Sequence, residues 1–290
     1  MNILIGLIPA LAWGILPLVV TKIGGKPINQ IIGTTFGTLM MALFVWLIMR
    51  PEIGLGPFWI TFLSGASWAL GQFLQYMAFK RVGVSKAMPI STGLQLVGTS
   101  LLGVLAFGEW GEGSEKLIGF SALLLIIVGI TLTTIKSVKM KAENADHSSV
   151  FMTMSIFLVS TLGYVGYSAF PRIANVSGWQ GFFPQALGMA SMSVLLAMGT
   201  IGTKVFKEKT TWFNLLSGVI FSIAALTYLI SAQKNGVTTG FTLSQMNVVI
   251  ATLGGIVILK EHKTKQELIF TFIGLALVIV GGVVIGNMSK

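Results

Sequence analysis

The chain alternates long uncharged runs, made mostly of apolar residues, with short charged segments. Ten of the runs are about 19 to 24 residues long, which suffices for a helix to cross the ~30 Å hydrocarbon core of a bilayer. None of the ten contains Asp, Glu, Lys, Arg or His. The pattern predicts ten membrane-spanning helices, with ends defined to about 2 to 4 residues, over residues 2–21, 29–49, 57–79, 87–107, 117–135, 150–170, 180–203, 212–233, 237–259 and 268–288.

Polar and aromatic side chains recur at helical spacing inside two neighbouring runs. The first run carries Trp68, Gln72, Gln75 and Tyr76 on one helix face, and the second run carries Ser91 and Gln95 on one face. Gln72 lies about 12 Å along its helix from Lys80, and Gln95 about 13.5 Å from Lys86. Both amides are therefore expected near the middle of the membrane.

Other runs extend this set with three tyrosines, two amides and an early tryptophan. A hydroxyl-rich solute suits such residues, because amides both donate and accept hydrogen bonds and aromatic faces cover apolar ring faces. The alternative for each amide is a hydrogen bond between packed helices. The predicted binding site consists of Trp13, Trp68, Gln72, Gln75, Ser91, Gln95, Tyr164, Tyr167, Tyr228, Gln245 and Asn247.

The composition is typical of a membrane protein, and it excludes several kinds of catalytic and metal-binding site. Apolar residues make up 54% and charged residues only 10% of the chain, against about 25% charged in soluble domains. There is no cysteine, which excludes a thiolate nucleophile, a disulfide and a cysteine metal site. The only histidines, His147 and His262, fall in predicted loops. We therefore predict no enzyme activity, no cofactor and no metal, and we expect no cleavable signal peptide.

The net charge of +10 reflects topology. Fourteen of the nineteen basic residues lie in the connections after the first, third, fifth, seventh and ninth runs. The positive-inside rule places these connections in the cytoplasm and both termini outside the cell membrane. The surplus charge is therefore assigned to membrane orientation, and no nucleic-acid partner is predicted.

The two halves of the chain carry matching motifs. Gly83-Val84-Ser85 precedes the fourth run and Gly236-Val237-Thr238 the ninth, while Glu109 and Glu261 follow the same two runs. An odd number of spans per half inverts the second copy, as in many transporters. We predict two inverted five-helix repeats, residues 1–136 and 150–290, joined by a cytoplasmic linker at 137–149. The two glutamates are expected to cap helices or anchor loops.

The stretches 71–76 and 89–95, together with Gly108-Glu109-Trp110, resemble the bacterial glucose uptake proteins. These are the glucose/ribose porters of the drug/metabolite transporter superfamily. The resemblance covers nearly the whole chain. It implies sugar import through a central cavity lined mainly by spans 1, 3, 4, 6, 8 and 9, with spans 5 and 10 at the periphery, and glucose as the favoured substrate.

An exporter of drugs or metabolites on the same fold is the alternative. Exporters of cationic drugs generally need a carboxylate within the membrane, and no predicted span has one. The expected partners are a small sugar and membrane lipid, with the protein a monomer or homodimer. Because the spans contain no titratable acid or base, proton coupling and facilitated diffusion both stay open.

Overall fold

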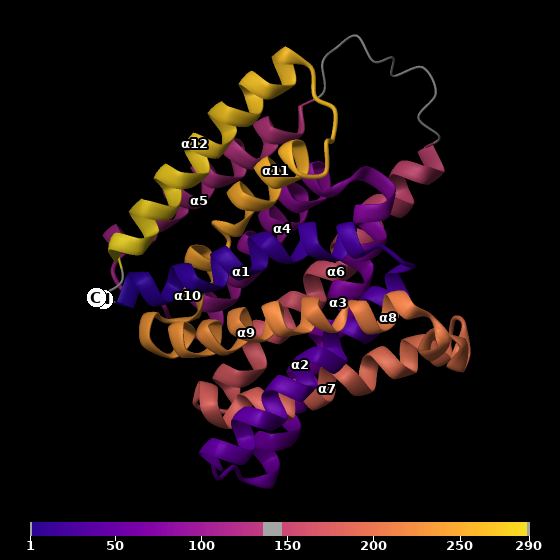
Figure 1. Ribbon diagram of the computed structural model, residues 1–290. Helices are drawn as coiled ribbons and strands as arrows, with labels where there is room; N and C mark the ends of the chain where they lie inside the picture. The colour runs from indigo at the N-terminus through magenta and orange to yellow at the C-terminus, as the bar shows by residue number, and fades with distance from the viewer. Residues whose placement is uncertain (1, 136–146, 289–290) are drawn as a thin grey trace.

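The computed structural model describes residues 2–135 and 147–288, and every regular element within these ranges is a helix (Figure 1). The elements are α1 (Asn2–Ile23), α2 (Pro27–Met49), α3 (Leu55–Val82), α4 (Val84–Ala106), α5 (Gly113–Thr134), α6 (His147–Ile173), α7 (Gly178–Met198), the 3₁₀ helix η2 (Gly202–Lys207), α8 (Lys209–Phe213), α9 (Leu215–Asn235), α10 (Val237–Ser244), α11 (Asn247–Val257) and α12 (Lys265–Met288). Most of the predicted linker, residues 137–146, lies outside the described ranges, and α6 begins within its last three residues.

Nine segments in the described part of the chain are long and apolar enough to cross a membrane. They coincide with nine of the ten predicted runs. The remaining run, 57–79, lies within α3, which is 28 residues long. This helix is less apolar than the others, because it carries Gln72 and Gln75 in its second half and ends on Lys80 and Arg81.

Two predicted runs are not single regular helices. Residues 237–259 form α10 and α11, with a break at Gln245 and Met246, and residues 212–233 start at the end of α8 and continue as α9. The prediction of one regular helix over 237–259 was therefore wrong. Neither Gly nor Pro occurs at the break, so the usual sequence signals for an interruption are absent.

Competition for backbone carbonyls accompanies the break. The Ser244 hydroxyl donates to the carbonyl oxygen of Phe241 at 2.6 Å. The backbone N–H of Gln245 is shared between the carbonyl oxygens of Phe241 at 3.0 Å and Thr242 at 3.1 Å. Side-chain hydroxyls that bond to preceding carbonyls weaken and bend helices. The tightened turn that results ends α10 at Ser244.

The helices form one bundle with a peripheral pair. α3 packs against α6 and α7, α1 against α9, and α2 against α7 and α9. α5 and α12 pack mainly on each other and lie side by side at one edge of the molecule (Figure 1). This agrees with the peripheral position that the family resemblance implied for spans 5 and 10.

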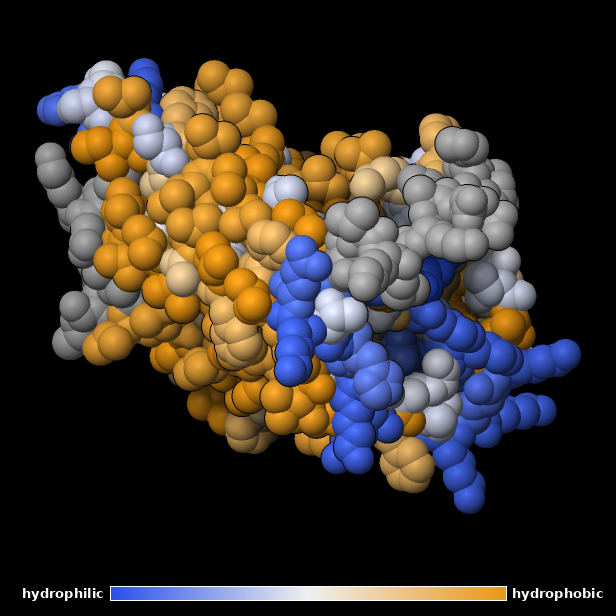
Figure 2. Space-filling model, turned by 90° about the horizontal axis from the view of Figure 1, so that it is seen from above, coloured by the Kyte–Doolittle hydropathy of each residue, from blue (hydrophilic) through white to orange (hydrophobic). Residues whose placement is uncertain are grey.

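Large apolar side chains face outward from the bundle. On α2 they include Met40, Phe44, Leu47 and Ile48, all more than half exposed. Figure 2 shows hydrophobic residues covering most of one face, with hydrophilic residues gathered toward one end. An apolar surface this extensive is unusual for a soluble monomer and matches a surface that lipid covers.

Glycines allow α3 and α7 to approach closely. A methyl group at Gly65 would overlap the backbone oxygen of Gln185, and one at Gly188 would overlap the backbone oxygen of Phe62. Close backbone contact of this kind is typical of membrane helix pairs. The α3–α7 contact therefore depends on the absence of a side chain at these positions.

Replacing Gly65 with alanine should destabilise the protein. Alanine favours an isolated helix by about 1 kcal/mol over glycine, but overpacking of a tight contact costs about 1 to 3 kcal/mol. We expect the packing cost to dominate, so that the thermal unfolding midpoint in detergent falls. Gly56 lies in the same helix, and a methyl group added there would have no atom within 4 Å, so Gly56→Ala is the matched control. A higher midpoint for Gly65→Ala would contradict this account.

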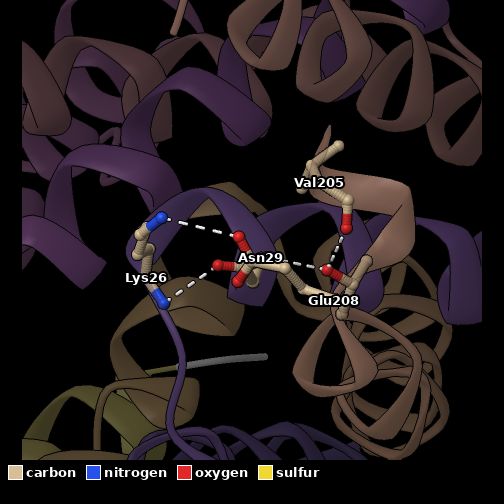
Figure 3. A network of polar contacts seen from close by, with 5 residues as sticks. Lys26, Asn29, Val205 and Glu208 are labelled. Carbon is tan, nitrogen blue, oxygen red and sulfur yellow. Dashed lines mark hydrogen bonds and ion pairs between the residues drawn. The ribbon is translucent and has the colours of Figure 1, made fainter. Parts of the chain in front are cut away.

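A polar network fastens the α1–α2 turn to the segment before α9 (Figure 3). The Asn29 side chain accepts from the backbone N–H of Lys26 at 3.0 Å and donates to the Thr211 hydroxyl at 2.8 Å. That hydroxyl donates in turn to the carbonyl oxygen of Val205 at 2.7 Å. The ion pair between Lys26 and Glu208, at 3.5 Å, is solvent-exposed and contributes little. The buried amide and hydroxyl therefore make the firmer part of the connection.

Lys263 joins the loop before α12 to α5. Its Nζ donates to the carbonyl oxygen of Thr133 at 3.0 Å and to the hydroxyl of Thr271 at 2.8 Å. Burial lowers the pKa of the Lys263 ammonium below its ordinary value. The folded state therefore holds this proton less tightly than the unfolded state does. The contribution of Lys263 to the free energy of unfolding increases as the pH rises from the pKa of the folded state to the pKa of the unfolded state.

Candidate functional site

A central cavity lies between helices from both halves of the chain and encloses about 490 Å³ of empty space, including its open mouth. Its walls come from α1, α3, α4, α6, α10, the break at Gln245 and the start of α11. The lining residues are Trp13, Leu16, Pro17, Trp68, Gln72, Gln75, Tyr76, Phe79, Met88, Thr92, Gln95, Tyr164, Tyr167, Phe241, Gln245 and Asn247.

The cavity brings together nine of the eleven residues predicted from the sequence. The exceptions are Ser91 and Tyr228. Ser91 shares a face with Gln95 but lies behind the lining, where it bonds to two lining amides. Tyr228 lines a second cavity. Helical spacing determined which residues share a face, but it could not determine how far each helix is rotated about its axis.

Several lining residues were absent from the sequence prediction. Thr92 lies three residues before Gln95, and Phe79 lies three residues after Tyr76, so helical spacing could have found both. The apolar Leu16, Met88 and Phe241 carried no comparable signal. Their contribution is to shape the walls between the polar groups.

Gln75 is the centre of a hydrogen-bond network on the cavity wall. Its Oε1 accepts from Nε2 of Gln72 at 2.9 Å and from the hydroxyl of Tyr164 at 2.8 Å. Its Nε2 donates to the hydroxyl oxygen of Ser91 at 2.8 Å, which also accepts from Nε2 of Gln95 at 2.7 Å. The network joins α3, α4 and α6. These amides therefore line the cavity and also bridge helices, so the two alternatives drawn from the sequence are not exclusive.

Three polar atoms around the cavity have no hydrogen-bond partner within the described ranges. They are the indole N–H of Trp13, the hydroxyl of Tyr167 and the side-chain oxygen of Asn247, and all three are buried. A buried polar group without a partner costs about 1 to 3 kcal/mol. Two groups that can donate and one that accepts thus surround the cavity, and a polar occupant would satisfy them.

Aromatic side chains form another part of the lining, and Phe221 packs behind two of them. The ring of Trp13 lies 6.5 Å from that of Tyr167 and 6.2 Å from that of Phe221, measured between centroids. Trp68 packs on Phe221 at 4.1 Å. Amides and aromatic rings together give the lining the amphipathic character that a sugar ring requires.

The break between α10 and α11 places two further amides at the cavity. Gln245 occupies the break itself, and Asn247 begins α11. Both line the cavity and both are at least 95% buried. Interrupted helices next to a central site are a recurring feature of membrane transporters.

The two glutamates after α4 and α11 make reciprocal contacts. Glu109 accepts from the backbone N–H groups of Val237 and Thr238, both at 2.7 Å, at the start of α10. Glu261 accepts from the backbone N–H groups of Val84 at 2.8 Å and Ser85 at 2.9 Å, at the start of α4. Each carboxylate therefore satisfies two N–H groups that have no partner within the capped helix. The sequence prediction that these residues cap helices is confirmed.

Glycine makes both capped turns possible. Gly83 and Gly236 have φ angles of 81° and 80°, in the region that side-chain-bearing residues avoid. Each directs the chain directly into the capped helix. The equivalent turns and caps thus occur once in each half of the chain.

Acidic and histidine side chains do not gather at either cavity. Among the residues that the structure describes, no three His, Asp or Glu side chains lie close enough together to hold a metal ion. The central lining itself is uncharged.

The bundle and its buried polar cavity define a multi-pass membrane protein with a central site of the kind that transporters use. The sequence model of a family described as sugar transport protein matches residues 4–288. The chain belongs to this sugar transport family, as the resemblance found in the sequence indicated. Membership points away from an enzyme.

Named relatives agree with this family. A candidate sugar uptake protein of Listeria monocytogenes is 50% identical over 286 residues, covering 99% of each chain. A candidate ribose uptake protein of Latilactobacillus sakei is 49% identical over 286 residues, covering 97% of this chain and 96% of its own. One crystal structure shares the fold with a TM-score of 0.73 at 18% identity, covering 99% of this chain and 97% of the other.

Proposed function

We propose that this chain imports a neutral monosaccharide by alternating access around the central cavity. The observation that carries the proposal is the uncharged lining, which combines linked amides, aromatic rings and unpartnered polar atoms. Glucose is the substrate that the family resemblance favours. The names of several relatives at 43 to 49% identity refer to ribose, which makes ribose the sugar to test beside it.

The amide network supports a neutral, hydroxyl-rich solute. A charged substrate would need a counter-charge, and the central lining contains none. Each sugar hydroxyl can accept from an amide nitrogen and donate to an amide oxygen. Sugar hydroxyls can therefore replace the bonds that Gln72, Gln75 and Gln95 make within the network, with little loss of hydrogen bonding.

Sugar binding requires the amide network to open. Gln72, Gln75 and Gln95 bond to one another or to Ser91 through the same groups that a sugar would use. We infer that the amides bond to one another in the absence of sugar and separate around it. This exchange couples occupancy of the site to movement of α3, α4 and α6.

The inverted repeats and ten spans belong to the same proposal. The repeats would comprise residues 1–136 and 150–290, with α3 as the tenth span. Reciprocal capping by Glu109 and Glu261 supports this division, since an inverted repeat makes equivalent contacts twice at opposite faces. The distribution of lysines supports an orientation with both termini outside the cell membrane.

Uptake into proteoliposomes tests the function. Wild-type protein should take up labelled glucose or ribose, and Gln95→Ala and Gln245→Ala should each reduce uptake at low sugar concentration by about 10-fold or more, because each removes a buried polar partner of the sugar. Gln30→Ala is the control, since Gln30 is a buried glutamine of α2 outside the cavity. Normal uptake in both cavity variants would reject this site, and no uptake of any monosaccharide by the wild type would reject the function.

A further inference from the structure

A second cavity lies beside the central one. It encloses about 440 Å³ of empty space, including its open mouth, at the ends of α6 and α9 and the start of α10. Arg172, Asn175 and Gln233 are exposed and form its mouth, whereas Ser168 and Tyr228 are buried at its inner end. The cavity therefore runs from the protein surface toward the central site.

Tyr228 separates the two cavities. Its ring stacks on Tyr167 with centroids 5.7 Å apart and an interplanar angle of 23°. It also lies 5.4 Å from Trp13 and 5.9 Å from Phe241. These three neighbours line the central cavity, whereas Tyr228 itself lines the second one. A solute passing from one cavity to the other would have to displace this aromatic layer.

The Tyr228 hydroxyl makes no hydrogen bond of standard geometry in the described part of the chain, and its polar neighbour at the inner end of the cavity is the Ser168 side chain. The residue is 1% exposed and lines the second cavity. Leaving a buried hydroxyl unpaired is unfavourable unless water or a ligand supplies the bond. At the inner end of a cavity that opens to the surface, such a hydroxyl is suited to meet a hydroxyl of an arriving solute.

Arg172 is the one charged residue among the described residues that line this cavity, and it is exposed at the mouth. The buried inner end, at Ser168 and Tyr228, is uncharged. The remaining polar groups are amides and hydroxyls, the same chemistry as the central site.

We propose that the second cavity is an access vestibule that binds the neutral sugar before it passes Tyr228 into the central site. This inference rests on the proposed function. The vestibule opens on the face that carries few basic residues, which the positive-inside rule assigns to the outside of the cell. Tyr228 acts there as a gate, with its hydroxyl bonding to the waiting sugar and its ring closing the passage.

Cysteine modification tests the vestibule directly, because the natural chain contains no cysteine. The variant Gln233→Cys places a thiol at the mouth, and Ser114→Cys places one at an exposed position outside both cavities. Uptake by each variant before modification serves as that variant's own reference. A bulky, membrane-impermeant maleimide added from outside to right-side-out vesicles should reduce uptake by Gln233→Cys to the background of protein-free vesicles, and leave Ser114→Cys unchanged.

The variant Tyr228→Phe tests the gate without the use of a maleimide. It keeps the ring and removes only the hydroxyl, so the apparent KM should rise about five-fold, as loss of one neutral hydrogen bond implies, while kcat stays within about two-fold. An unchanged KM would remove the sugar contact from Tyr228.

The outcomes separate the vestibule from the proposed function. Full uptake after complete modification of Gln233→Cys, with uptake still lost in Gln95→Ala, would overturn the vestibule and leave the central site standing. Reaction of Gln233→Cys only from the cytoplasmic side would also overturn the vestibule as the outer access route. Absence of sugar uptake by the unmodified natural chain would overturn the proposed function, and the vestibule with it.

Discussion

Sugar uptake should fall by about 100-fold or more in kcat/KM when Gln75 is replaced by leucine, because a site built to bond a substrate hydroxyl loses most of its binding when the buried partner is missing. Gln75 donates to Ser91 and accepts from Gln72 and Tyr164. Leucine is similar in size but can make none of these bonds. The variant therefore removes the polar chemistry of the central site with a small change in volume.

The fold should tolerate the same change. Tyr164 still donates to Gln72 at 2.8 Å, and Ser91 still accepts from Gln95 at 2.7 Å, so most of the surrounding groups keep a partner. Helix content measured by circular dichroism should match the wild type. The control is Gln185→Leu, because Gln185 is fully buried in α7 and lines neither cavity. Equal losses of uptake in Gln185→Leu and Gln75→Leu would mean that buried amides support the bundle and do not bind sugar.

Much of the helical architecture follows from the sequence, because it depends on local composition. Uncharged runs of spanning length predict nine segments that the structure also contains. Spacing of three and four residues correctly groups Gln72 with Gln75 on one face of α3. These properties are set within a single helix, so a reading of the chain can recover them.

Features set by tertiary contacts are not recoverable in this way. The break at Gln245 depends on hydroxyls competing for carbonyls, and neither Gly nor Pro marks it. Tyr228 faces the second cavity because of the rotation of α9 within the bundle. The sequence indicates that Glu109 caps or anchors an element, but the choice of α10, in the other half of the chain, depends on how the helices cross.

Replacing Glu109 or Glu261 with glutamine should lower the stability of the protein by about 1.5 to 3 kcal/mol for each cap, the range for hydrogen bonds to charged groups. Each carboxylate accepts from two backbone N–H groups. A glutamine side chain retains one accepting oxygen, and its NH₂ group would face an N–H donor. We expect lower thermal unfolding midpoints for both variants, while Glu52→Gln, at an exposed position, should leave the midpoint unchanged.

The two losses should add. Glu261 caps the first residue of α4, and Glu109 follows the last turn of that helix, which is 23 residues or about 34 Å long. Sites this far apart without shared partners contribute independently. The double variant should therefore lose the sum of the two single effects. A double variant no less stable than either single variant would show that the caps act as one unit.

Transport should respond differently from stability, because the two caps lie at opposite faces of the proposed membrane orientation. Weakening the Glu109 cap should favour the state that is open to the outside, where Glu109 lies in the proposed orientation. Weakening the Glu261 cap should favour the state that is open to the cytoplasm. A difference of about 1.5 to 3 kcal/mol shifts such an equilibrium by about 10- to 150-fold. Labelling of Gln233→Cys should therefore be faster in Glu109→Gln and slower in Glu261→Gln, with the double variant near the wild type. If both single variants changed the labelling rate in the same direction, both caps would stay formed throughout the transport cycle. Alternating access would then depend on other contacts.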